Sequence, residues 1–156
     1  PPLFLNTGNS NPISLFGGHF NSAAINSDGS ISFIPESILK SPTSQIRIAR
    51  LPNNEDAVSL ACLNEFIFAA GSNGGCFVSE TSTGKLNFTQ VKSLKGTKIK
   101  CVSGISNHCI AVAIDGHVFG FGLNNFGQLG LGDKIKETNE FKLISSLDNI
   151  DFAYAG

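Results

Sequence analysis

Three histidines and four cysteines carry most of the reactive or metal-binding chemistry that this sequence offers. They are His19, His108, His117, Cys62, Cys76, Cys101 and Cys109. Zinc sites place such side chains at short, regular spacings, of which Cys-x-x-Cys is the commonest. No such spacing occurs in this chain, so we expect neither a metal nor a cofactor.

The four cysteines lie in apolar, strand-like segments. We therefore expect them to be reduced and buried, as in an intracellular protein of the cytoplasm or the nucleus. The alternative is a disulfide between Cys62 and Cys76 in a secreted protein.

Two glycine-containing stretches bear on nucleotide binding and catalysis. Gly120-Phe121-Gly122 is followed by Gly127, which breaks the Gly-x-Gly-x-x-Gly spacing of dinucleotide sites. Thr83-Gly84-Lys85 lacks the hydroxyl residue that follows the lysine of a phosphate loop. No serine–histidine–acid arrangement stands out either. We identify no catalytic residue and do not expect an enzyme.

The composition narrows the range of partners. Of the 156 residues, 41% are hydrophobic and 15% are charged, and the formal net charge is −1. This balance favours a well-buried sheet protein and argues against direct binding of nucleic acid. The basic stretch Lys92, Lys95, Lys98 and Lys100 is interpreted as a solvated connection, with a phosphate-contacting patch as the alternative. No apolar run is long enough to span a membrane, so no membrane partner is expected.

The elements that position these residues recur three times along the chain. In each copy an apolar strand is followed by a strand rich in small residues, a tight turn and a third strand. The turns are Asp28-Gly29, Asn73-Gly74 and Asp115-Gly116, with glycines 45 and 42 residues apart. Asp-Gly or Asn-Gly between apolar runs predicts a hairpin with a type I′ turn. A less regular fourth segment follows in each copy, at 45–51, 86–91 and 141–144.

Four strands per repeat at this period are typical of the blades of a β-propeller. We predict an all-β propeller fragment of about three four-stranded blades plus the start of a fourth. The predicted blade-like repeats are 12–56, 57–98 and 99–149. Residues 1–11 would hold a strand of a preceding blade, and residues 150–156 would begin the next one.

The third copy resembles the regulator of chromosome condensation repeat family, whose members form seven-bladed propellers. The residues that match the family pattern at its spacing are Gly104, His108, Asp115, Gly116, Gly122, Asn124, Gly127, Gln128, Leu129, Gly130 and Gly132. The first two copies match only through the small-residue strand and the turn. Asn21 and Phe66 stand where the family histidine is expected, and Phe121 stands where the family usually has tryptophan.

We expect these motif residues to build the blade. Gly122 and Asn124 would shape the turn that leaves the third strand. Gly127 to Gly132 would fold into a compact loop that packs on the neighbouring blade, with Gln128 satisfying buried backbone groups. The candidate partner-facing residues are Asn124, Asn125 and Phe126.

The resemblance implies a protein-interaction scaffold. The alternative that it implies is a guanine-nucleotide exchange factor for a Ran-like or other small GTPase, which would need no catalytic side chain. The expected partners are another protein, with a small GTPase as the candidate, and the remainder of the propeller or a second copy of this chain, since a truncated ring leaves its ends uncovered.

Overall fold

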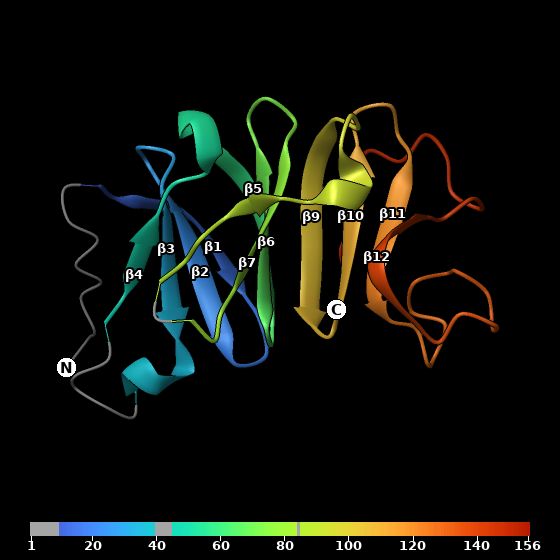
Figure 1. Ribbon diagram of the computed structural model, residues 1–156, viewed down its shortest axis with the longest axis horizontal. Helices are drawn as coiled ribbons and strands as arrows, with labels where there is room; N and C mark the ends of the chain where they lie inside the picture. The colour runs from blue at the N-terminus through green and yellow to red at the C-terminus, as the bar shows by residue number, and fades with distance from the viewer. Residues whose placement is uncertain (1–9, 40–44, 84) are drawn as a thin grey trace.

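The chain folds as part of a β-propeller, which confirms the predicted all-β class (Figure 1). The computed structural model describes residues 10–39, 45–83 and 85–156. Residues 1–9, on which most of the predicted preceding strand falls, lie outside this range. The strands are β1 (Pro12–Gly17), β2 (Asn21–Asn26), β3 (Ile31–Pro35), β4 (Arg47–Ala49), β5 (Ala57–Leu63), β6 (Phe66–Gly71), β7 (Cys76–Glu80), β8 (Thr89–Gln90), β9 (Ile99–Ser106), β10 (His108–Ala113), β11 (Val118–Leu123) and β12 (Glu137–Leu143).

Short 3-10 helices accompany the strands. They are η1 (Glu36–Leu39), η2 (Pro52–Asn54) and η3 (Lys92–Leu94). Within the described residues, no helix is long and apolar enough to cross a membrane.

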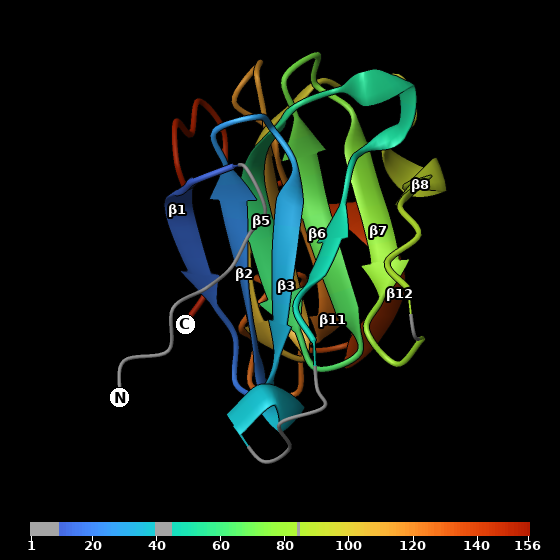
Figure 2. The same ribbon diagram turned by 90° about the vertical axis from the view of Figure 1, so that its left-hand side faces the viewer.

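The strands form three antiparallel units of four, which we call the first blade (β1–β4), the second blade (β5–β8) and the third blade (β9–β12). The first is a separate sheet with the order β1-β2-β3-β4. The other two are joined through their first strands by a short parallel pairing, in which Cys62 faces Ile105 and Leu63 faces Ser106. The blades stand side by side in chain order in Figure 1, and Figure 2 shows the first blade in front of the others.

The second blade packs on both of its faces, and β6 shows how its sequence allows this. Side chains alternate across a strand, so successive residues of β6 point to opposite neighbours. Ile67 and Ala69 pack toward the first blade, whereas Phe68 and Ala70 pack toward the third. All four are buried, which explains why this strand is apolar throughout instead of alternating with polar residues.

The three predicted hairpins are present, but the type I′ prediction for their turns is wrong. Gly29, Gly74 and Gly116 have φ between +77° and +89°, whereas the preceding Asp or Asn does not have positive φ. A type I′ turn needs positive φ at both central residues. The amide of each turn glycine donates to a carbonyl three residues earlier, as Gly74 N does to Gly71 O at 2.9 Å. The turns are therefore three-residue loops that end in a left-handed glycine.

Each turn glycine also fastens its blade to the next stretch of chain. The carbonyls of Gly29, Gly74 and Gly116 accept hydrogen bonds from the amides of Ala57, Ile99 and Ile150, at 3.1, 2.9 and 3.1 Å. A Cβ at Gly116 would lie 2.8 Å from the Cα of Asn149, closer than carbon atoms approach in a packed protein. The same glycine thus satisfies the turn and permits the close contact.

Candidate functional site

The loop that joins β11 to β12 is the most elaborate connection in the third blade, and the buried side chain of Asn124 organises it. The Asn124 Nδ2 group donates to the carbonyls of Gly132 and Ile135 at 3.2 and 2.7 Å, and Oδ1 accepts from the Leu129 amide at 2.8 Å. Asn124 is only 1% exposed. One amide side chain therefore pairs with two carbonyl groups and one amide group of the loop. Without it, water would have to bond these groups.

Left-handed glycines give this loop its shape. Gly127, Gly130 and Gly132 all have positive φ, and the Gly127 and Gly130 amides close two successive turns at 3.0 and 2.9 Å. Between them Leu129 is buried and packs against the place where Gly120 lacks a side chain. The loop is thus anchored by an apolar contact as well as by Asn124.

The predicted partner-facing residues separate into two kinds. Asn125 is exposed, and the Phe126 side chain is 95% exposed. The Phe126 amide donates to Gln128 Oε1 at 3.0 Å in an exposed part of the loop. Gln128 was expected to satisfy buried backbone groups, but this hydrogen bond stabilises the exposed loop tip. Asn124 is committed to the loop interior and offers no side-chain group to a partner. Only Asn125 and Phe126 can face outward.

Three further motif residues lie where β9, β10 and β11 meet. A Cβ at Gly104 would lie 2.7 Å from the His108 carbonyl oxygen and 2.9 Å from Leu63 of the second blade. A Cβ at Gly122 would overlap the carbonyl of Asn107. These glycines therefore allow the backbones to approach closely. His108 is half-buried beside Gly122, and this burial lowers the pKa of its imidazole.

Asp115 lies in the hairpin turn with Gly116, on the surface. Its Oδ1 atom is 3.1 Å from His117 Nδ1 and accepts a hydrogen bond from the His117 amide at 3.2 Å. The hydrogen bonds from the His117 side chain and backbone lower the pKa of the Asp115 carboxyl group. This is a local arrangement that supports the turn.

The cysteines and the lysines of the basic stretch have structural roles. All four cysteines are free, and Cys62 and Cys76 pack in different core clusters on opposite sides of the second blade. The pKa of each of these two thiols is raised to about 12 by burial. The basic stretch connects the second blade to the third, and Lys100 pairs with Asp151 at 2.5 Å.

Sequence reasoning missed a row of asparagines that links neighbouring blades. Asn21, Asn64 and Asn107 lie between the first two strands of each blade or at the start of the second, and are spaced 43 residues apart. Asn21 Nδ2 donates to the Asn64 carbonyl at 3.4 Å, and Asn64 Nδ2 donates to Asn107 Oδ1 at 3.0 Å. The identical spacing of the three asparagines is a signal that could have identified them.

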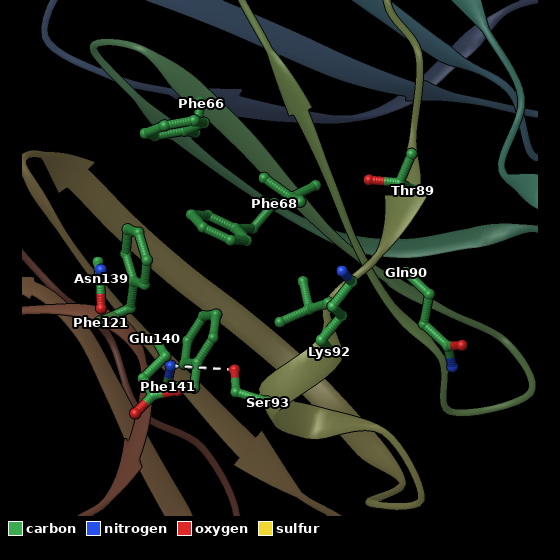
Figure 3. A pocket seen from close by; sticks show the side chains of 12 residues that line it. Phe66, Phe68, Thr89, Gln90, Lys92, Ser93, Phe121, Asn139, Glu140 and Phe141 are labelled. Atoms are coloured by element: carbon green, nitrogen blue, oxygen red, sulfur yellow. Dashed lines mark hydrogen bonds between the residues drawn. The ribbon is translucent and has the colours of Figure 1, made fainter.

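A second feature that the sequence did not reveal is an aromatic groove between the second and third blades (Figure 3). The aromatic rings that line it come from β6, β11 and β12; they are Phe66, Phe68, Phe121 and Phe141. Phe66 and Phe121 are two of the positions where the sequence departs from the family pattern. No cluster of three or more potential metal ligands is found among the residues that the structure describes.

Comparison with known proteins places the most regular repeat in a family. Models of the regulator of chromosome condensation (RCC1) repeat match residues 115–150 and 99–128, which include most of the third blade. The human probable E3 ubiquitin-protein ligase HERC3 is 30% identical over 99 residues, which are 56% of this chain and 9% of HERC3. The human X-linked retinitis pigmentosa GTPase regulator is 34% identical over 102 residues, which are 59% of this chain and 10% of that protein.

Solved structures show the same fold. Prp20p from Saccharomyces cerevisiae superimposes with a TM-score of 0.71 at 16% identity, over 93% of this chain and 40% of Prp20p. Human WBSCR16 superimposes with a TM-score of 0.66 at 14% identity, over 88% of this chain and 38% of the other. The chain thus spans about a tenth of these curated relatives and about two fifths of these propellers.

Proposed function

Because the chain belongs to the regulator of chromosome condensation repeat family, we propose that it forms part of a propeller that serves as a protein-interaction scaffold. The observation that carries the proposal is the loop tip at Phe126. An aromatic side chain that is 95% exposed stands on a loop fixed by the buried Asn124. Aromatic residues on pre-organised loops dominate the energy of many interfaces, since little conformational entropy is lost when they bind.

The experiment is affinity capture with the complete parent protein, followed by quantitative mass spectrometry. We expect Phe126→Ser to lose at least one partner that the wild type retains. The matched control is Leu143→Ser, which also removes a partly exposed apolar side chain, from β12 and outside the loop. If the two variants and the wild type capture the same proteins in the same amounts, the loop is not the binding surface.

A second candidate function is regulation of a small GTPase by nucleotide exchange. It is favoured by the likeness to a protein named as a GTPase regulator and to Prp20p, whose structure was described with its binding to Gsp1p. Exchange requires only that the propeller bind the nucleotide-free state more tightly than the nucleotide-bound one. The test is release of a fluorescent guanine nucleotide from a panel of small GTPases by the complete ring. Acceleration on one of them would support exchange, and none on any of them would argue against it.

A further inference from the structure

The groove between the second and third blades does not result from the open ends of the fragment. Both of its walls belong to the described chain, because β6, β7 and β8 form one side and β11 and β12 the other. Three hollows of about 370, 410 and 310 Å³ all include Phe66 in their lining. Together they make one groove with Phe66 at its centre.

The floor of this groove is aromatic. The Phe68 ring lies 4.9 Å from that of Phe121 and 5.2 Å from that of Phe141, measured between centroids, and both pairs are edge-on. Phe68 and Phe141 are buried, whereas Phe66 and Phe121 are half-buried and keep part of their surface accessible. The floor is therefore well packed underneath and can still receive one more apolar side chain from outside.

The groove is open because the outer strand of the second blade is short. Strand β8 has two residues and pairs only with Phe77 and Val78 of β7. Beyond these pairs, no strand of the described part of the chain lies opposite Ser79 and Glu80 on that side, although the Asn87 amide donates to Ser79 Oγ at 2.9 Å. An incomplete strand edge beside apolar pockets suits an extended peptide, which can place alternate side chains in the pockets.

The charges around the groove specify the chemistry of such a peptide. Four of the lining residues are exposed glutamates: Glu65, Glu80, Glu137 and Glu140. Among the described residues, none of these carboxylates is part of an ion pair. Lys92 is the single cation among the described residues that line the groove. The rim therefore carries an excess of negative charge that would attract lysine or arginine and repel an acidic segment.

We propose that this groove binds an extended basic segment of a partner protein. One large apolar side chain of the segment contacts Phe66 and Phe121, and flanking lysines or arginines lie beside the glutamates. The proposal rests on the interaction-scaffold function, but it concerns a surface separate from the Phe126 loop. The two proposals can therefore fail independently. If Phe126→Ser captures the same partners as the wild type, the loop proposal fails, but peptide binding in the groove is unaffected.

The test measures fluorescence anisotropy of a labelled peptide, Gly-Lys-Lys-Phe-Lys-Lys-Gly, titrated with the full 156-residue chain. The double variant Glu137→Lys/Glu140→Lys is expected to weaken binding by about 10-fold or more, because it reverses two rim charges. The matched control Asp133→Lys/Asp148→Lys makes the same change in net charge at two exposed residues that do not line the groove. It is expected to weaken binding by less than about 3-fold.

Peptide variants separate the two parts of the recognition. Replacing the phenylalanine of the peptide with glycine should weaken binding by about 10-fold, and replacing its lysines with glutamates should abolish it. Equal losses in the two double variants would mean that only net charge matters, which overturns the proposal, as would equal binding of the glycine peptide. A wild-type dimer in sedimentation that is dissociated by Glu137→Lys/Glu140→Lys, without peptide binding, would assign the groove to a second copy and overturn it as well.

Discussion

Asn124 and Asn125 are adjacent in the chain but have opposite environments, which makes them a natural pair for measuring the contribution of one side chain to the loop. Asn124→Ala leaves a buried amide and two carbonyls without their partner, and each buried group left unpaired costs about 1 to 3 kcal/mol. We expect a loss of about 2 to 4 kcal/mol in the free energy of unfolding, measured by urea denaturation. The exposed Asn125→Ala should cost less than about 0.5 kcal/mol.

Hydrogen exchange gives a local measure of the same effect. The Leu129 amide donates to Asn124 Oδ1 and lies in the buried part of the loop, so its protection should fall in Asn124→Ala and persist in Asn125→Ala. If the Leu129 amide stays protected in both variants, the loop is held by the packing of Leu129 and not by the asparagine.

Asn124 and the aromatic floor show which roles of single residues the sequence can and cannot predict. The role of Asn124 in shaping its turn was an expectation from the family pattern, and the structure adds the three groups that it holds. The aromatic floor could not be predicted, because Phe66 and Phe121 lie 55 residues apart and their rings meet edge-on at 6.3 Å only after two blades have packed. Departures from the family at these two positions were visible, but their proximity was not.

At the scale of strands and turns, the periodic part of the sequence was the most informative. Apolar runs and Asp-Gly or Asn-Gly pairs located the hairpins, but not the turn type, which depends on one extra loop residue. The outer strands were less predictable because they bury little surface. For example, β12 begins at Glu137, whereas the sequence indicated a segment from Phe141.

The contact between a turn glycine and the next segment can be tested with two glycines that share a backbone conformation. Gly116 and Gly127 both have positive φ, so alanine at either position incurs a similar strain of about 1 kcal/mol. A Cβ at Gly116 meets the backbone of Asn149, whereas a Cβ at Gly127 meets nothing within 4 Å. We expect Gly116→Ala to be less stable than Gly127→Ala by at least about 1 kcal/mol in urea denaturation.

The location of the damage distinguishes this explanation from a general loss of stability. In Gly116→Ala, the Ile150 amide should lose hydrogen-exchange protection first, because its acceptor is the Gly116 carbonyl. Equal free energies of unfolding for the two alanine variants would show that the backbone at Asn149 can move away from the added methyl group without loss of stability.

At the scale of the whole molecule, the three blades are connected by contacts that repeat with the chain. The row of asparagines joins all three, and Ser59 of the second blade bonds Val102 of the third through its Oγ, which accepts from the Val102 amide at 3.0 Å. Ser103 Oγ accepts from the Ala155 amide at 3.1 Å in a comparable way. We therefore keep the proposal that residues 150–156 begin a further blade that continues the array.

Such an array leaves apolar surface uncovered on its first blade and on the segment that follows its third. On the first blade, Ile13, Leu15 and Ile48 are 66%, 70% and 51% exposed. In the segment after the third blade, Phe152 and Tyr154 are 60% and 87% exposed, and they line a hollow together with Phe16 and Val58 of the first two blades. In a longer propeller the adjoining blades would cover such surfaces, since each repeat buries its faces only against its neighbours.

We therefore predict that the isolated 156-residue chain self-associates through these exposed apolar surfaces, with an average mass in sedimentation equilibrium that rises with concentration. Leu15→Ser/Ile48→Ser should weaken the association, because it removes two of the exposed apolar side chains of the first blade. Phe126→Ser is the control, since Phe126 is 95% exposed but stands on the loop between β11 and β12, and it should leave the association unchanged. A stable wild-type monomer at all concentrations would show that the end blades tolerate exposure without a neighbour.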